Sequence, residues 1–226
     1  MLSIVSCIHN EAGNVTSLIQ QVAQICAYTP YELILVNDGS TDDSLKVAAS
    51  AADSNVILVN LKKRQGQTGA LAAGLKMVRG DFVATLDGDL QNDPADLLPM
   101  LALLRAEGLD AVFGVRRRRQ DPLWSKRLPS RFANWAIRRI TDCPLSDLGC
   151  STKVLTRAAV LKIPLTGQRH RLIGVLCYLM GMKIREVDVS HSARVYGQTK
   201  YGWGRVYFLL RDLVGIWIDY RRNGLT

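Results

Sequence analysis

The first half of the chain alternates short apolar runs with segments of helical periodicity. Five runs rich in Val, Ile and Leu predict strands: SIVSCI (3–8), ELILVN (32–37), NVILVN (55–60), DFVATLD (81–87) and DAVFGV (110–115). Amphipathic segments between them predict helices at residues 14–26, 42–54, 68–78 and 94–107. Near-continuous apolar strands that alternate with helices are typical of a parallel sheet covered on both faces. The pattern therefore predicts an α/β fold whose ligands bind at the carboxyl ends of the strands.

The second half has a different pattern. Residues 116–140 contain nine Lys or Arg and a single acidic residue, Asp121. A further strand-like stretch follows at 183–189, and an amphipathic segment at 203–222 ends the pattern. We therefore expect one domain at residues 1–202 and a C-terminal amphipathic helix at residues 203–226.

Composition narrows the class of protein. The 226 residues are 48% hydrophobic and 22% charged, as in an ordinary folded domain. A surplus of 29 Lys and Arg over 20 Asp and Glu indicates an anionic partner, either nucleic acid, acidic lipid or a phosphorylated substrate. Only this charge favours nucleic acid as the partner, since the sequence has no helix-turn-helix and no RNA-binding aromatic motif. We expect no nucleic-acid partner, although a basic binding domain without enzymatic activity remains an alternative.

The cysteines and the apolar runs bear on location. Five scattered cysteines without a C-x-x-C pair predict free, buried thiols in a reducing compartment. We expect no signal peptide, because residues 1–8 lack a basic start and a cleavage site, and no run of eighteen uncharged apolar residues occurs. We expect a cytoplasmic protein that lies peripherally on the cytoplasmic face of a membrane.

Two carboxylates follow the fourth predicted strand, in Asp87-Gly88-Asp89. Side chains at i and i+2 after a strand point the same way, and two carboxylates placed so repel each other unless a cation lies between them. Mg²⁺ or Mn²⁺, held by carboxylates and substrate phosphates, suits this arrangement. The alternative is a polar turn, with Asp93 capping the helix that starts at Pro94.

Polar residues also follow the other predicted strands. Asp38, after the second strand, can accept hydrogen bonds from a base or ribose, whereas Thr41 and Asp42 are better explained as turn and cap residues. Asn10 and Glu11, after the first strand, would lie beside the same crevice.

Positive charge and glycines follow the third predicted strand. Residues 62–69, which include Lys63, would place them at a helix N-terminus as a diphosphate cradle. Neither G-x-G-x-x-G nor G-x-x-x-x-G-K-[ST] occurs, which argues against a Rossmann dehydrogenase or a P-loop NTPase.

Seven ordered motifs make a resemblance specific. They are NEAGNV (10–15), NDGSTD (37–42), KRQGQTGAL (63–71), LDGDLQNDP (86–94), SDLGCSTKV (146–154), RHRLIG (169–174) and RVYGQTKYG (194–202). In this order they resemble the polyprenyl-phosphate glycosyltransferases, a GT-A-fold group that includes dolichol-phosphate mannose synthases and bacterial undecaprenyl-phosphate sugar transferases. The resemblance runs from Ser3 to about Asp219, and it is closer to the bacterial enzymes.

The resemblance assigns expected roles to individual residues. The metal ligands would be Asp89 and Gln91, with Asp87 at or near the diphosphate. The nucleotide would contact Asn10, Glu11, Asp38, Lys63 and Asp87. The acceptor phosphate would contact Arg116, Ser130 and Arg131. A loop carrying Arg194 and Lys200 would close over both phosphates. The expected catalytic residues are Asp89, Arg116, Arg131, Arg194 and Lys200.

The implied reaction is inverting transfer of a sugar from a nucleotide-sugar to polyprenyl phosphate, with UDP favoured over GDP and Mg²⁺ or Mn²⁺ as cofactor. A phosphate monoester is largely dianionic at neutral pH, so it needs orientation by arginines instead of a general base. Transfer to a hydroxyl of a glycan, lipid or protein is an alternative. A small transmembrane partner subunit or a second copy of the chain are further expected partners.

One predicted helix near residues 127–138 permits two interpretations. Its basic side carries Arg127, Arg131 and Arg138, and the neighbouring side carries Leu128, Phe132, Trp135 and Ala136. The helix could lie in a membrane interface. Alternatively, its apolar side packs on the sheet and its arginines are solvated.

Overall fold

The computed structural model describes residues 1–117, 135, 137–167, 169–192, 213, 215 and 216. Seven strands form its sheet: β1 (Leu2–Ile8), β2 (Tyr31–Asp38), β3 (Val56–Leu61), β4 (Phe82–Asp87), β5 (Ala111–Val115), β6 (Lys153–Thr156) and β7 (Ile184–Asp188). The helices are α1 (Ala12–Ile25), α2 (Ser44–Ala51), α3 (Gly66–Leu75), α4 (Leu97–Glu107), α6 (Arg157–Lys162) and α7 (Ile173–Leu179). Short 3₁₀ turns occupy η1 (Pro94–Asp96) and η3 (Arg169–Arg171).

The strands lie in the order β3-β2-β1-β4-β6-β5-β7. Strand β6 runs antiparallel to both β4 and β5, and the other neighbouring pairs are parallel. The predicted α/β fold with a mostly parallel sheet is therefore confirmed. All strands except β6 end at the same edge of the sheet, which brings together the residues that follow β1, β2, β4 and β5.

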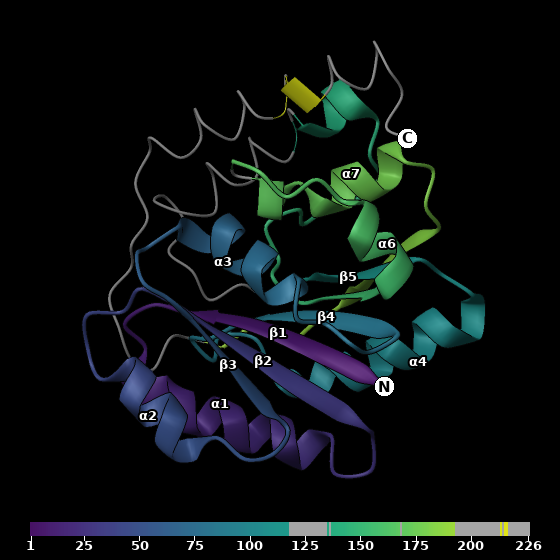
Figure 1. Ribbon diagram of the computed structural model, residues 1–226. Coiled ribbons are helices and arrows are strands. Elements are labelled where there is room, and N and C mark those ends of the chain that lie inside the picture. The colour runs from purple at the N-terminus through teal and green to yellow at the C-terminus, as the bar shows by residue number, and fades with distance from the viewer. Residues whose placement is uncertain (118–134, 136, 168, 193–212, 214, 217–226) are drawn as a thin grey trace.

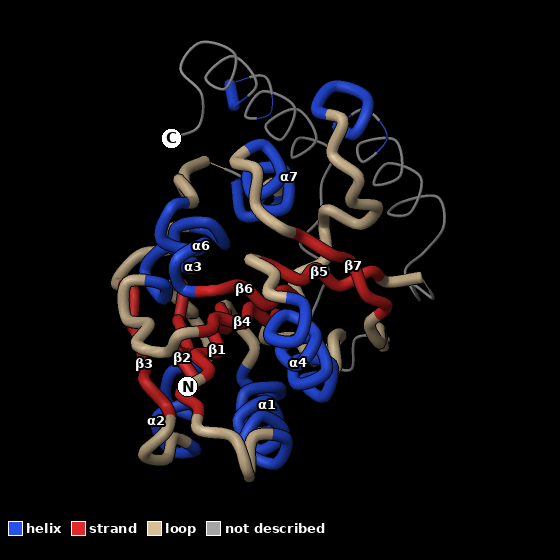
Figure 2. The backbone as a smooth tube through the Cα atoms, turned by 90° about the vertical axis from the view of Figure 1, so that its right-hand side faces the viewer, coloured by secondary structure: helices blue, strands red, loops and turns tan. Residues whose placement is uncertain are grey.

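Helices cover both faces of the sheet, as Figures 1 and 2 show. Successive side chains of a strand point to opposite faces. In β1, Val5 packs in the cluster that contains residues of α3, α6 and α7, whereas Ile4 and Ile8 pack in the cluster of α1 and α4. Strands buried on both faces explain the near-continuous apolar runs of the sequence.

All six strand-like stretches of the sequence are strands in the structure, and all four predicted helices are present. Strand β6 was missed because it is only four residues long and includes a lysine. Asp93 caps η1, as the polar-turn alternative predicts, since its side chain accepts a hydrogen bond from the backbone N–H of Ala95 at 2.9 Å. None of the helices in the described part of the chain has both the length and the apolar character needed to cross a membrane.

The two segments expected at a membrane lie largely outside the described residues. Of 203–226, only Leu213, Gly215 and Ile216 are described, and both apolar side chains are buried in the cluster formed by α3, α6 and α7. Of the helix near 127–138, Trp135 is 60% exposed, while Ile137 is buried in the same cluster.

Candidate active site

The carboxyl ends of the central strands meet at one edge of the sheet. Ile8 of β1 pairs with Asn37 of β2, and Cys7 pairs with Asp87 of β4. The loops that follow these strands are therefore neighbours, as expected where ligands bind to a parallel sheet.

The Asp87-Gly88-Asp89 turn passes directly over the end of β1. A Cβ atom on Gly88 would lie 2.6 Å from Cγ2 of Ile8 and 3.1 Å from the carbonyl oxygen of Cys7, so only glycine fits there. Asp89 is 8% exposed, and its Oδ1 accepts a hydrogen bond from the backbone N–H of Gln91 at 3.2 Å. Close packing on β1 thus places both carboxylates at the edge of the sheet.

The Asp87 carboxylate lies among groups from several segments. Gln67 of α3 donates its Nε2–H to Oδ1 of Asp87 at 2.9 Å. Desolvation, followed by repulsion from Asp89, raises the pKa of Asp87 above its ordinary value, although Lys153 and Arg116 act in the opposite direction. Burial and the neighbouring carboxylate thus disfavour the charged form of Asp87, and a bound cation would favour it.

These residues fit a hard divalent cation. Asp87 and Asp89 offer carboxylate oxygens, and Gln91 offers an amide oxygen, because its Nε2–H is directed to the carbonyl oxygen of Ser192 at 3.4 Å. The donor set is all oxygen, as Mg²⁺ and Mn²⁺ prefer. Among the described residues, no group of three or more His, Cys, Asp or Glu side chains is placed to hold a metal ion.

Asp38 connects β2 to the start of α3. Its two carboxylate oxygens accept hydrogen bonds from the backbone N–H groups of Gln65 at 2.6 Å and Gly66 at 2.9 Å. Asp38 therefore satisfies N–H groups that a helix start leaves without intrahelical partners. A contact with a nucleoside would use the remaining lone pairs of this buried carboxylate, and Lys63 lies exposed in the adjoining loop.

Asn10 and Glu11 link the loops after β1 and β2. Asn10 has a φ of +56°. Its Oδ1 accepts a hydrogen bond from the backbone N–H of Thr41 at 2.8 Å. The backbone N–H of Glu11 donates to Oγ of Ser44 at 2.8 Å. These contacts hold the two loops together at the edge where Asp38 also lies.

Arg116 follows β5 and is buried in an ion pair. Its Nε–H and an Nη2–H donate to the two carboxylate oxygens of Asp147 at 2.8 and 2.9 Å. Burial by itself disfavours the charge, but these hydrogen bonds and the attraction to Asp147 raise the pKa of Arg116. Glu186 of β7 accepts hydrogen bonds from the backbone N–H groups of Ser146 at 2.6 Å and Asp147 at 3.2 Å, which fixes the turn that carries Asp147.

Lys153 of β6 is a buried lysine that sequence reasoning missed. It is 6% exposed, its Nζ donates to the carbonyl oxygen of Cys150, and burial lowers its pKa. Its partner across the strands is Thr85 of β4, two residues before Asp87. The SDLGCSTKV motif marked this segment, but only the antiparallel pairing with β4 places it beside the carboxylates.

A second connection joins the RHRLIG motif to the site. The hydroxyl of Thr68 in α3 and Nδ1 of His170 in η3 form a hydrogen bond of 2.6 Å. Both residues are buried. This hydrogen bond joins residues 102 positions apart and fixes η3 against the start of α3. The same helix places Gln67 in contact with Asp87.

Four expected site residues lie outside the described part of the chain: Ser130, Arg131, Arg194 and Lys200. The structure brings together Asp87, Asp89 and Gln91 in one turn. It places Asn10, Glu11 and Asp38 at the neighbouring strand ends, with Arg116 at the end of β5. The roles of all these residues in binding and catalysis remain predictions.

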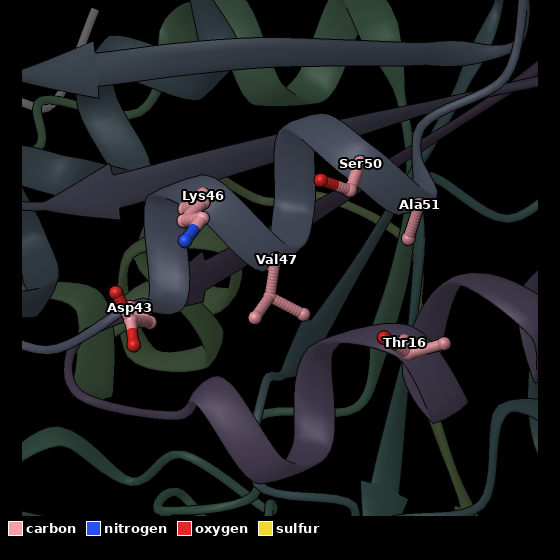
Figure 3. A pocket seen from close by; sticks show the side chains of 6 residues that line it. All are labelled: Thr16, Asp43, Lys46, Val47, Ser50 and Ala51. Carbon is pink, nitrogen blue, oxygen red and sulfur yellow. The ribbon is translucent and has the colours of Figure 1, made fainter.

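A shallow pocket of about 360 Å³ lies elsewhere, between α1 and α2 (Figure 3). It is lined by Thr16, Asp43, Lys46, Val47, Ser50 and Ala51, and Val47 points toward α1. None of the expected site residues lines this pocket.

Two curated relatives match nearly the whole chain. The dodecaprenyl-phosphate galacturonate synthase of Rhizobium johnstonii is 39% identical over 222 residues, which cover 95% of this chain and 66% of the relative. The undecaprenyl-phosphate 4-deoxy-4-formamido-L-arabinose transferase of Yersinia enterocolitica is 36% identical over 218 residues, which cover 94% of this chain and 66% of the relative. The chain spans about two thirds of the length of these relatives.

Solved structures share the fold. A glucosyl-3-phosphoglycerate synthase from Mycobacterium tuberculosis, in complex with Mn²⁺ and UDP-glucose, superposes with a TM-score of 0.74 at 20% identity. The match covers 96% of this chain and 78% of that one. The sheet and its helices thus have the GT-A arrangement.

A family model also matches the sequence. The model described as glycosyl transferase family 2 matches residues 3–163, which include β1 to β6 and the Asp87-Gly88-Asp89 turn. Family model, curated relatives and fold agree, and the chain belongs to glycosyl transferase family 2.

Proposed function

We propose that this glycosyltransferase moves a sugar from a nucleotide-sugar, UDP-linked in preference to GDP-linked, to a polyprenyl phosphate with inversion at the anomeric carbon. One observation carries the proposal: relatives aligned along 94–95% of the chain are both named for sugar transfer or synthesis on a polyprenyl phosphate. The carboxylate pair at the end of β4 supports it. A divalent cation held by these carboxylates would supply the positive charge that a nucleoside diphosphate requires.

The donor would bind at the carboxyl ends of β1, β2 and β4. Asp87, Asp89 and Gln91 would hold Mg²⁺ or Mn²⁺ there, and the nucleoside would lie against the loops that carry Asn10, Glu11 and Asp38, with Lys63 near the diphosphate. When bound, the ion would offset the negative charge that develops on the leaving nucleoside diphosphate. Asp89, 8% exposed at the sheet edge, is the residue on which this assignment depends most.

The acceptor phosphate would be oriented by arginine. Its second pKa is about 6, so at neutral pH the phosphate is already a dianionic nucleophile and no base is required. Asp147 takes two of the five N–H groups of Arg116. The other three have no partner among the described residues, so they could bind phosphate oxygens from a fixed direction. Ser130 and Arg131 would add acceptor contacts, and Arg194 and Lys200 would close over both phosphates. Attack opposite the leaving diphosphate inverts the anomeric carbon.

The acceptor also explains the expected location, peripheral on the cytoplasmic face of a membrane. Trp135 is 60% and Ile140 is 43% exposed, and Arg138 and Arg139 between them are also exposed. Exposed aromatic and cationic side chains together suit an anionic lipid surface. The helix at 203–226, a small transmembrane partner subunit or a second copy of the chain would provide further attachment.

A product assay tests the proposed function. Purified protein would be incubated with undecaprenyl phosphate, Mg²⁺ or Mn²⁺, and a panel of UDP- and GDP-sugars that includes galacturonic acid and 4-deoxy-4-formamido-L-arabinose. Lipid products would be read by mass spectrometry. We expect one UDP-sugar to give a glycosylated lipid phosphate, and we expect the product to disappear with chelator and in Asp89→Asn.

The matched control is Asp43→Asn, the same substitution at the exposed N-cap position of α2. This variant should retain activity. Transfer to an added glycan or diacylglycerol hydroxyl instead of the lipid phosphate would refute the proposed acceptor. Absence of nucleotide binding by the wild-type chain would refute the proposed donor.

A further inference from the structure

The loop that joins β3 to α3 carries three consecutive cations. Lys62, Lys63 and Arg64 are exposed, and none of them forms an ion pair with another residue in the described part of the chain. Like charges at adjacent positions repel each other, so this basic loop (residues 62–66) has no tendency of its own to hold one shape. Its position therefore depends on contacts with neighbouring segments.

Asp38, the last residue of β2, makes the first of these contacts. It is 4% exposed, and its two carboxylate oxygens accept hydrogen bonds from the backbone N–H groups of Gln65 and Gly66 at 2.6 and 2.9 Å. Hydrogen bonds to an ionised acceptor are about twice as strong as those between neutral groups. The carbonyl oxygen of Asp38 accepts a further hydrogen bond from Nδ1 of His9 at 2.9 Å. The residue that holds the basic loop is thus itself held by the loop after β1.

Gly39 allows the basic loop to pack directly on the main chain that follows β2. Its φ is +61°, and a Cβ atom there would lie 2.7 Å from the backbone nitrogen of Arg64 and 3.0 Å from the carbonyl carbon of Lys63. Gly108 offers a comparison, because its φ is +60° but a Cβ atom there would meet nothing within 4 Å. A side chain at Gly39 would therefore displace the basic loop, whereas a side chain at Gly108 would add only backbone strain.

The start of α3 connects the basic loop to the carboxylate turn. Gln67 follows Gly66 directly and donates its Nε2–H to Oδ1 of Asp87 at 2.9 Å. The chain that begins with the exposed cations thus continues without a break into a residue that contacts the proposed ion site.

We propose that Asp38 and Gly39 are positioning residues that hold the basic loop in place for the diphosphate of the donor. Asp38 acts on the donor through the backbone of Gln65 and Gly66, instead of through a contact with the nucleoside. Because the loop is fixed before the donor binds, binding loses little free energy to ordering it. The inference rests on the proposed function, because it takes Lys63 to lie near the diphosphate.

A comparison of two ligands tests this role without turnover. The affinities of UDP, with Mg²⁺ present, and of uridine, which lacks phosphates, would be measured by isothermal titration calorimetry. We expect Gly39→Ala and Asp38→Asn to weaken UDP binding by about tenfold or more, and to leave uridine binding within about threefold of wild type. Asp38→Asn acts because it replaces one of the two accepting oxygens by an NH₂ group, which cannot accept a hydrogen bond.

Each variant has a matched control. Gly108→Ala has the same backbone strain without the displaced loop. Asp53→Asn changes an exposed carboxylate that also accepts a hydrogen bond from a backbone N–H, that of Asn55 at 2.8 Å. Both controls should bind UDP as wild type does. Melting curves without ligand identify a variant that fails to fold, in which case the other variant of the pair Gly39→Ala and Asp38→Asn carries the test.

The outcomes separate this inference from the proposed function. Equal losses of UDP and uridine affinity in Asp38→Asn would overturn the inference, because Asp38 would then contact the nucleoside directly, and the proposed function would stand. Unchanged UDP affinity in folded Gly39→Ala would overturn the placement of the basic loop at the diphosphate. Absence of UDP binding by wild type would refute the proposed donor, and the inference with it.

Discussion

The ion pair of Arg116 and Asp147 offers a stringent test of how the proposed acceptor side of the site is built. Two hydrogen bonds of 2.8 and 2.9 Å join the groups, and the side chains are 10% and 8% exposed. Asp147→Ala would leave the guanidinium buried without its counter-charge. The next residue along the chain, Arg117, makes a contrasting pair with Asp188, whose side chains are 75% and 63% exposed.

Burial sets the expected magnitude. Removing one partner of a buried ion pair costs about 3–5 kcal/mol of unfolding free energy, because an uncompensated charge remains inside. For a chain of this size, each kcal/mol corresponds to about 2–4 °C in Tm, so Asp147→Ala should lower Tm by about 6–20 °C. Asp188→Ala should cost no more than about 1 kcal/mol, since water and salt screen the exposed pair.

Thermal and urea unfolding of four variants provides the assay: Asp147→Ala, Arg116→Met, the double variant and Asp188→Ala. The double variant should be more stable than Asp147→Ala, because neither charge is then left alone. Additive losses in the double variant, or a loss below about 1 kcal/mol for Asp147→Ala, would refute the reasoning.

Two further predictions concern the core and the thiols. Gly74→Ala should cost about 1–3 kcal/mol, measured by urea unfolding, because the new Cβ would lie 2.6 Å from Cγ1 of Val5 and 2.8 Å from Cγ2 of Val36 and would force α3 off the sheet; an unchanged midpoint would contradict this. Burial raises the pKa of Cys26 and Cys143 to about 11 and of Cys177 to about 12, so a thiol reagent at a pH of about 8 should label these cysteines slowly in the native protein and fully in denaturant. Rapid native labelling of any of the three would show that its site opens to solvent.

The sequence determines much of the fold by local patterning. Strands such as β1 and β2 are buried on both faces, so most of their residues are apolar. These apolar runs predict strands even when the neighbouring strands are unknown. The Asp87-Gly88-Asp89 turn can also be identified from the sequence as a candidate site. Two carboxylates directly after a buried strand carry an electrostatic cost that only a ligand or fixed cations can offset.

Tertiary structure decides what surrounds those carboxylates. Ser151 and Lys153 come close to Asp87 because β6 inserts antiparallel between β4 and β5. The four-residue strand β6 has no sequence pattern that predicts this pairing. Asp147 likewise acquires its partner across 31 residues, through a turn held by Glu186 of β7. Periodicity reports which side of an element is buried, whereas contacts between distant elements depend on strand order, and strand order is set by how all the helices and strands pack together.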